Sequence, residues 1–174
     1  MVKIISYEKS VTPKYHLHLA VAPTKMNDRY EWFLEKATEI GISEITPIIC
    51  DHSERKFVKT DRFDKIVQSA MKQSLHYYLP KLNEPISFKD FIKLKKEGLL
   101  LIAHCEETDK KSLKSLVKPN KNVTVLIGPE GDFSNKEITL ALENNYIPVT
   151  LGSTRLRTET AAIVACHSVV FIND

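Results

Sequence analysis

The sequence has little glycine and cysteine, and it has no long hydrophobic run. Five of its 174 residues are glycine and three are cysteine. No apolar stretch approaches the ~20 residues that a membrane-spanning helix needs. The first residues also lack the apolar core of a signal peptide. These absences argue against an integral membrane protein and against a secreted disulfide scaffold, so we expect a cytoplasmic protein.

The cysteines and histidines show no metal-binding pattern. Cys50, Cys105 and Cys166 have no CxxC spacing, and no pair of ligand residues has the close spacing that zinc sites use. We therefore expect no metal. Each cysteine lies in or beside an apolar run, which predicts buried free thiols. His104 and His167 also fall in apolar segments, and we expect both to be core histidines with satisfied hydrogen bonds.

The charge is unevenly distributed along a chain of ordinary composition. Hydrophobic residues make up 43% and charged residues 27%, which is typical of one globular domain. Residues 1–120 hold a net charge of +5, and residues 121–174 hold −2, within a total of +3. A basic surface that attracts a polyanion would explain this excess, and so would solvated lysines on helix faces.

Strand and helix patterns alternate along the chain, which predicts an α/β fold with a mostly parallel sheet flanked by helices. Residues 1–15 are interpreted as a lead-in segment and residues 16–174 as one domain. Apolar runs predict strands at 16–22, 45–50, 99–104, 123–127 and 147–151. Helical periodicity predicts helices at 25–40, 60–75, 87–94, 134–142 and 158–171.

Several residues are placed where helices begin and end. We expect Asn27 or Asp28, Thr60 and Ser87 to act as N-caps. Ser134 and Glu137 are spaced as a capping box. Glycines are expected to end two helices, Gly41 the first and Gly98 the one that starts at Ser87.

Two glycine-containing turns in the last third are the strongest functional signal. One follows the strand ending at Ile127, the other follows the strand ending at Leu151, and together they hold three of the five glycines. In an open α/β sheet, ligands bind at the carboxyl ends of strands. Short connections of this length are also common without any function. From the residues alone, both readings stay open.

The chemistry of these turns restricts the ligand. They contain neither GxGxxG nor the Lys-Ser/Thr of a phosphate loop, and no basic residue occurs before Arg155. A di- or triphosphate is therefore disfavoured. An adenosine-like ligand that is weakly charged or cationic fits better, because Glu130, Asp132 and Glu159 add negative potential. Each carboxylate could instead be a helix cap or a member of a salt bridge.

The two turns resemble the paired signature of the RsmE family, which comprises ribosomal RNA small-subunit methyltransferases of the knotted SPOUT class. The resemblance rests on residues 127–134 (IGPEGDFS) with Glu137, and on residues 151–161 (LGSTRLRTETA). Shorter upstream blocks are similar in order and spacing: Lys25-x-x-Asp28-Arg29-x-Glu31, residues 36–41 (KATEIG), residues 53–55 (SER), and Ala70-x-x-Gln73-Ser74 with Pro80. The match covers residues ~16–172.

The resemblance implies an enzyme that transfers a methyl group from S-adenosylmethionine to N3 of a uridine in 16S ribosomal RNA of the small subunit. It also implies a C-terminal trefoil knot and a homodimer. The cofactor pocket would be formed by the two turns and by the loop that follows His104. The implied cofactor-binding residues are Ala103, His104, Ile127, Gly128, Pro129, Glu130, Gly131, Leu151, Gly152, Leu156, Thr160 and Ala161.

Two arginines are the predicted catalytic residues. Arg157 is expected to stabilise the uracil anion or to bind its phosphate, and the alternative is a structural pair with Glu159 or Glu130. Arg29 is expected to reach the active site of a neighbouring subunit, as SPOUT enzymes are thought to share sites.

The chain departs from the family pattern at three places. The small N-terminal RNA-binding barrel of the family is replaced by a short lead-in, so we interpret the chain as the methyltransferase domain alone. Asp132 stands where the family usually has a second glycine, and this position must tolerate a Cβ. His76 stands where an arginine is expected. Alternative functions are methylation of another RNA, such as tRNA, and binding of cofactor or RNA without catalysis.

Overall fold

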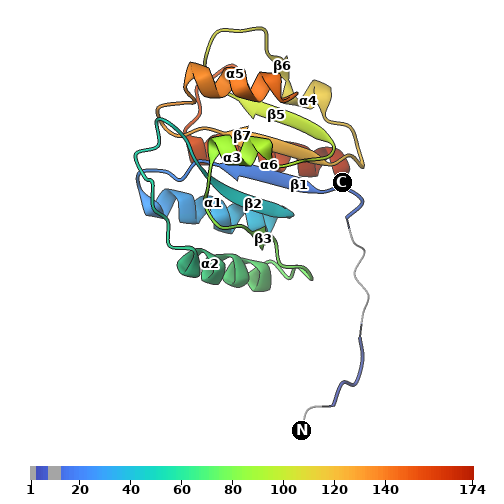
Figure 1. Ribbon diagram of the computed structural model, residues 1–174. Coiled ribbons are helices and arrows are strands. Elements are labelled where there is room, and N and C mark those ends of the chain that lie inside the picture. Colours follow the sequence, from blue (N-terminus) through green and yellow to red (C-terminus); the bar gives the residue numbers. More distant parts are fainter. Residues whose placement is uncertain (1–2, 8–12) are drawn as a thin grey trace.

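The computed structural model describes residues 3–7 and 13–174 of the chain (Figure 1). The lead-in segment predicted at residues 1–15 lies partly outside the described residues, and its described part forms no helix or strand. The strands are β1 Leu17–Val21, β2 Glu44–Ile49, β3 Lys81–Leu82, β4 Ile86–Ser87, β5 Leu99–Ala103, β6 Lys111–Ser112, β7 Val123–Ile127 and β8 Ile147–Thr150. The helices are α1 Asn27–Ile40, α2 Thr60–Gln73, α3 Phe88–Lys93, α4 Leu113–Leu116, α5 Asn135–Glu143 and α6 Thr158–Asn173.

The strands form one parallel sheet in the order β3-β2-β1-β7-β5-β8-β6, and β4 pairs with β2. The pairing register brings the last residues of three central strands together. Ile127 of β7 lies opposite Val21 of β1 and also opposite Ala103 of β5. The loops that leave these strands therefore start at the same edge of the sheet. This confirms the predicted fold class of a mostly parallel sheet flanked by helices.

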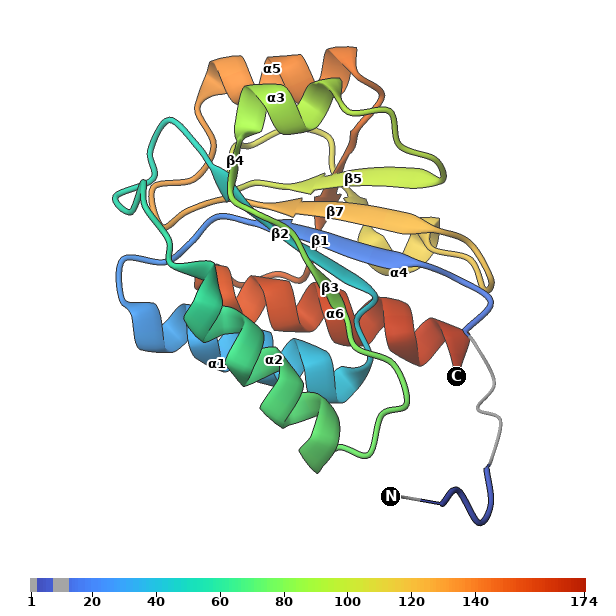
Figure 2. The same ribbon diagram turned by 60° about the horizontal axis from the view of Figure 1, so that its bottom comes forward.

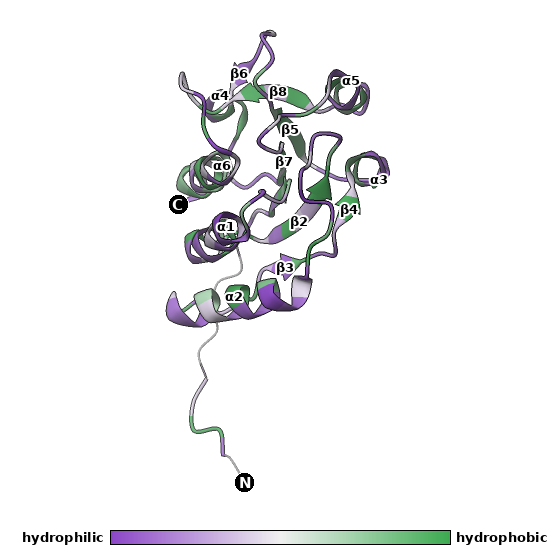
Figure 3. Ribbon diagram, turned by 90° about the vertical axis from the view of Figure 1, so that its left-hand side faces the viewer, coloured by the Kyte–Doolittle hydropathy of each residue, from purple (hydrophilic) through white to green (hydrophobic). Residues whose placement is uncertain are grey.

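Helices cover both faces of the sheet, which explains why its central strands are apolar throughout. Alternate residues of β1 belong to different cores, because strand side chains alternate between faces. Leu19 packs in the core that includes residues of α1, α2 and α6, whereas Ala20 packs in the core that includes residues of α3 and α5. Viewed along the sheet, α1 and α6 lie on one side and α3 and α5 on the other (Figure 3). A continuous apolar run is the pattern expected of such doubly covered strands.

The predicted helix caps have mixed outcomes. Ser87 and Ser134 cap their helices, and Ser134 with Glu137 forms a complete capping box. The predicted caps of α1 and α2 are wrong. The hydroxyl of Thr60 donates to Glu84 instead, and Met26 and Lys59 occupy the two N-cap positions without a side-chain bond.

The side chains of Asn27 and Asp28, at the start of α1, bond to other groups instead of capping the helix. The amide of Asn27 donates to Glu31, and a carboxylate oxygen of Asp28 accepts from the N–H of Arg29. At the other end, Gly41 adopts the predicted left-handed C-cap with φ 110°. Gly98 does not end α3, because that helix already stops at Lys93.

Two predictions about buried polar side chains are wrong. Cys50 and Cys166 are buried free thiols, but Cys105 is exposed because it lies two residues beyond the end of β5, outside the sheet. His167 is exposed on α6 rather than being part of the core. The short strands β4 and β6 are absent from the predicted elements because two residues are too few to show a periodicity.

Among the described residues, no helix has the length and apolar character needed to cross a membrane.

Candidate functional site

Two adjoining hollows lie where the carboxyl ends of β5, β7 and β8 meet the start of α6. The first has a volume of about 360 Å³ and the second about 420 Å³. They adjoin each other and share five lining residues: Ala103, Cys105, Arg155, Leu156 and Ala161. Volumes of this size are in the range of small-molecule sites. The predicted ligand turns therefore border real cavities.

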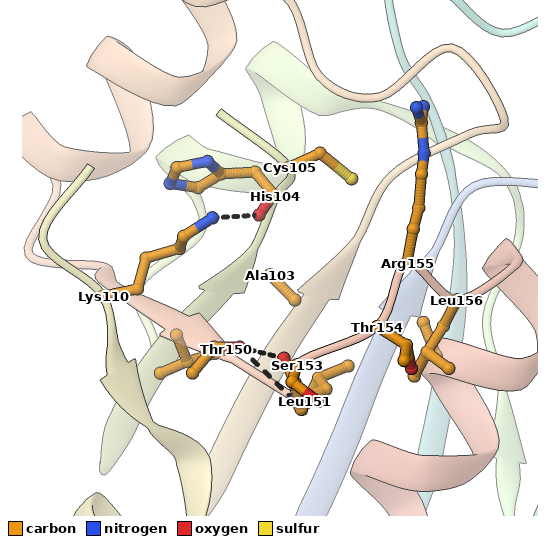
Figure 4. A pocket seen from close by; sticks show the side chains of 13 residues that line it. Ala103, His104, Cys105, Lys110, Thr150, Leu151, Ser153, Thr154, Arg155 and Leu156 are labelled. Atoms are coloured by element: carbon orange, nitrogen blue, oxygen red, sulfur yellow. Dashed lines mark hydrogen bonds between the residues drawn. The ribbon is translucent and has the colours of Figure 1, made fainter. Parts of the chain in front are cut away.

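The first hollow combines apolar walls with a tightly folded backbone turn (Figure 4). Its apolar lining includes Val149, Leu151 and Leu156. The turn after β8 is held by Thr150, whose hydroxyl donates to the carbonyl of Gly152 at 2.7 Å and accepts from its N–H at 3.3 Å. In Figure 4 the side chain of Arg155 rises on the opposite side of the hollow from His104 and Lys110. Such a hollow suits a flat, weakly polar group.

The second hollow carries charges of both signs. Glu130 and Asp132 line it together with Arg155 and Arg157. Within the described residues, no carboxylate forms an ion pair with either arginine, so the predicted structural pairing of Arg157 with Glu159 or Glu130 is not found. A zwitterionic ligand group fits this arrangement, because opposite charges are available without breaking an internal ion pair of the arginines.

Gly128 allows a close approach of two chain segments at the floor of the second hollow. A Cβ at this position would lie 3.1 Å from two ring atoms of Phe133 and 3.3 Å from its backbone nitrogen. The carbonyl of Gly128 accepts a 3.0 Å hydrogen bond from the hydroxyl of Thr158, in the first turn of α6. A side chain at this position would be in tight contact with the ring of Phe133, and the bond to Thr158 joins the turn after β7 to α6.

Asp132 occupies the turn in a left-handed conformation with φ 62°. Aspartate tolerates this region better than most residues. Its carboxylate accepts from the N–H of Cys105 at 2.7 Å and from the N–H of Phe133 at 2.8 Å. The prediction that this position tolerates a Cβ is confirmed, and the aspartate joins the turn after β7 to the loop after β5.

Loops from the first part of the chain support the turn after β7 from outside. The N–H of Lys25 donates to Glu130 at 2.9 Å, and Nδ1 of His52 lies 3.0 Å from the carbonyl of Gly131. The guanidinium of Arg55 donates to the carbonyls of Thr24 and Lys25 at 3.2 and 2.7 Å. These contacts hold the upstream loops against the rim of the second hollow.

His104 is buried beside the first hollow with both ring nitrogens unpaired within the described structure. The prediction of a satisfied core histidine is therefore wrong. Burial lowers the pKa of His104, and the nearby Lys110 lowers it further. The ammonium of Lys110 donates to the carbonyls of His104 and Glu106 at 3.0 and 2.8 Å, which holds the loop after β5 (Figure 4). Both ring nitrogens are shielded from solvent, so the ring lies behind the wall of the hollow.

Arg29 lies against the start of α6 in its own chain. Its guanidinium is 3.8 Å from one carboxylate oxygen of Glu159, while the other oxygen is buried without a hydrogen-bond partner in the described structure. Helix α1 and α6 run side by side under the sheet (Figure 2). Arg29 is therefore near the second hollow but does not line it.

Most of the predicted site residues line the two hollows, namely Ala103, His104, Ile127, Gly128, Pro129, Glu130, Leu151, Gly152, Leu156, Ala161 and Arg157. Gly131, Thr160 and Arg29 do not. The Cα of Gly131 faces His52 on the outside of the turn. Lining residues beyond the predicted set are Cys105, Lys110, Asp132, Val149, Thr150, Ser153, Thr154, Arg155 and Thr158. Lys110 could not have been found from the sequence, because it lies in a polar segment without a motif.

No group of three or more His, Cys, Asp or Glu residues within the described part of the chain is arranged to hold a metal ion.

Comparisons with known proteins place this site in context. The model of the RNA methyltransferase domain family matches residues 11–170. The ribosomal RNA small subunit methyltransferase E of Rickettsia conorii is 35% identical over 159 residues, which cover 90% of this chain and 64% of that protein. The chain thus spans slightly less than two thirds of the length of this relative.

Solved structures show the same architecture. A probable rRNA-methyltransferase from Porphyromonas gingivalis is 38% identical with a TM-score of 0.89, and the match covers 96% of this chain and 71% of that one. A methyltransferase from Legionella pneumophila, solved with bound cofactor SAM, is 33% identical with a TM-score of 0.83 and coverages of 90% and 66%.

Proposed function

Because the chain belongs to the RNA methyltransferase domain family and, within it, to the ribosomal RNA small subunit methyltransferase E proteins, we propose that it methylates N3 of a uridine in 16S ribosomal RNA with S-adenosylmethionine as cofactor. The observation that supports this most directly is the pair of joined hollows. One suits a flat heterocycle and the other suits a zwitterion, which are the two parts of this cofactor.

The residues of the two hollows fit the cofactor in complementary ways. In the first hollow, backbone groups of residues 150–156 and the walls formed by Leu151 and Leu156 would hold the adenosine. In the second, Arg155 or Arg157 would bind the carboxylate of the methionine part, and Glu130 or Asp132 would face its ammonium and sulfonium charges. The absence of a phosphate loop agrees with a nucleoside that carries no phosphate.

The reaction needs an acceptor that has lost a proton and a methyl group that is open to attack. Bound S-adenosylmethionine supplies an electrophilic methyl group on its sulfonium sulfur. N3 of uracil must lose its proton for the attack, and negative charge then develops on the uracil ring. Arg157 is exposed at the edge of the second hollow and has no ion pair within the described structure. Its guanidinium would stabilise that charge.

Family membership also suggests an assembly and a compartment. We propose a homodimer in which Arg29 contributes to the site of the neighbouring subunit, and a trefoil knot formed by the segment that leads from β8 into α6. Phe171 of α6 is 71% exposed and would be available to the partner subunit in such a dimer. A substrate in the small ribosomal subunit would place the protein in the cytoplasm.

Methyl transfer to small ribosomal subunits tests the proposal. Subunits from a strain that lacks this modification would be incubated with the protein and labelled S-adenosylmethionine, and the modified nucleotide would be mapped by mass spectrometry. We expect one 3-methyluridine per 16S RNA. Transfer to tRNA but not to subunits would show another RNA substrate. Cofactor binding without transfer to either RNA would show a binding domain and contradict the proposal.

A further inference from the structure

The loop between β2 and α2, residues 50–59, presents an aromatic side chain that the fold does not cover. Phe57 is 91% exposed, more than any other Phe, Tyr or Trp within the described residues. Its neighbour Val58 packs against the core, and Phe63 on the first turns of α2 is buried. The fold therefore buries apolar side chains close to Phe57 but leaves Phe57 itself exposed.

The first half of this loop is rigidly attached to the rim of the second hollow. The N–H of Asp51 donates to Glu137 at 3.0 Å, and the hydroxyl of Ser134 donates to the carboxylate of Asp51 at 2.6 Å. Ser53 is buried, and its hydroxyl accepts from the N–H of Cys50 at 2.9 Å. These bonds add to the contact of His52 with the turn after β7.

The second half is fixed close to Phe57. Arg55 donates to the carbonyls of Thr24 and Lys25, so a side chain two residues before Phe57 is tied to the loop before α1. The loop lies at the same end of the sheet as the turn that leads into α5, in both views of the fold (Figures 1 and 2). The segment that leads into Phe57 is thus tied, through Lys25, to Glu130 in the turn after β7.

The charges around Phe57 favour a polyanion. Lys56 and Lys59 are exposed, and neither forms an ion pair within the described structure. The nearby carboxylate of Glu54 pairs with Lys25 at 2.8 Å, and that of Asp51 is engaged by Ser134. Of the acids close to Phe57 in sequence, Asp61 and Asp64 keep exposed carboxylates without an ion pair in the described residues. The two lysines next to the ring therefore remain available for phosphates.

We propose that Phe57 is a stacking platform for an unpaired RNA base that flanks the methylated nucleotide, with Lys56 and Lys59 at the adjacent phosphates. This inference rests on the proposed function. An exposed ring between cations is the arrangement by which proteins bind single-stranded RNA, because every base offers a face for stacking. The core of a protein–protein interface would instead be depleted of lysine.

The test compares two substitutions of Phe57 with a distant control. Loss of one stacked base corresponds to a change of about 5- to 150-fold. In Phe57→Ala we expect KM for small ribosomal subunits to rise by that factor, with kcat and the calorimetric affinity for S-adenosylmethionine unchanged. Phe57→Trp keeps an aromatic face and should retain the wild-type KM. Tyr77→Ala removes another exposed ring, beyond the opposite end of α2, and should leave KM unchanged.

A spectroscopic measurement tests stacking without turnover. In a Trp32→Phe background, Phe57→Trp gives a single tryptophan at the proposed platform. Titration with an unstructured uridine-rich oligonucleotide should quench its fluorescence in a saturable and salt-sensitive way. Retained quenching without methyl transfer by the wild-type protein would contradict the proposed function but support the platform.

Two results would overturn the platform. One is an unchanged KM in Phe57→Ala together with no quenching of the tryptophan introduced by Phe57→Trp. The other is a loss of activity in Phe57→Ala that is accompanied by a smaller molecular mass in light scattering, which would assign Phe57 to the contact between two copies of the chain.

Discussion

The two ends of the parallel sheet each bury a histidine, but the two histidines differ in their hydrogen bonds. At the amino-terminal end, His18 is buried with Nε2 2.7 Å from the hydroxyl of Thr46, and it packs edge-on against Phe91. At the carboxyl end, His104 is buried with both ring nitrogens unpaired in the described structure. A buried polar group without a partner is costly. The two histidines therefore differ in hydrogen bonding although both are buried.

The charged side chains at the two ends also differ in whether they have partners within the chain. Glu44, at the amino-terminal end, receives hydrogen bonds from Asn83 at 2.6 Å and from Lys81 at 3.1 Å. Burial alone would raise the pKa of Glu44, but these bonds and the nearby His18 outweigh burial and hold its pKa below the ordinary value. Arg155 and Arg157 at the carboxyl end have no ion pair in the described structure. The amino-terminal end thus holds paired polar groups, whereas the carboxyl end keeps two arginines beside the hollows without an ion pair in the described residues.

The largest expected effect is at the carboxyl end. Arg157→Ala should lower kcat/KM for methyl transfer by about 100- to 1,000-fold, the cost of removing one group that stabilises developing charge. The matched control is Lys121→Ala, an exposed cation just before β7 at the opposite end of the sheet. Near wild-type activity in Arg157→Ala, with unchanged cofactor affinity, would remove this arginine from the mechanism.

The next effect concerns stability at the amino-terminal end. Burial lowers the pKa of His18 to about 4 from the ordinary 6.5. The unfolded chain therefore binds more protons between these values, and the free energy of unfolding should fall by up to about 3 kcal/mol as the pH drops from 6.5 to 4. Thermal melts across this range should show a shallower fall in His18→Gln. Identical pH slopes in both proteins would contradict the assignment.

Gly128→Ala should affect both stability and binding. The added Cβ would press on the ring of Phe133, and overpacking of this kind costs about 1–3 kcal/mol. We expect a lower melting temperature and about tenfold weaker binding of S-adenosylmethionine in calorimetry, because the floor of the second hollow must move. Unchanged affinity in a folded variant would show that this floor does not touch the cofactor.

The smallest expected effect is at Asp132. Asp132→Gly removes two hydrogen bonds but relieves the left-handed backbone, so the net loss of stability should be about 1 kcal/mol. Asp132→Asn keeps both an acceptor and the backbone preference, and it should lose less in the same denaturant titration. A glycine variant more stable than the wild-type protein would show that the link to Cys105 contributes nothing.

The sequence predicts the fold class, the long elements and most of the lining of the two hollows, for different reasons. Doubly buried strands such as β5 and β7 are visible as apolar runs, and the capping box at Ser134 is a local signal. The predicted cap of α2 is wrong because a tertiary partner, Glu84, competes for the hydroxyl of Thr60. The predicted caps of α1 are wrong because Asn27 and Asp28 bond to Glu31 and Arg29 of the same helix. Lys110 and Thr150 reach the site through loops whose paths depend on the whole fold.

The sequence also could not predict whether the ring nitrogens of His104 have hydrogen-bond partners. A histidine at the end of an apolar run looks the same whether its ring is satisfied, as in His18, or unpaired. Only the packing of the neighbouring elements decides this. For the same reason, the sequence could not show that the turns of residues 128–132 and 151–157 form two joined hollows rather than separate ones.

Calorimetric titration of the protein with S-adenosylmethionine, with ATP as the control ligand, tests the central claim most directly. The joined hollows should bind one S-adenosylmethionine per chain, and ATP should not bind because no phosphate loop is present. Binding of ATP, or no binding of S-adenosylmethionine to the folded protein, would contradict the assignment of the carboxyl end of the sheet as a cofactor site.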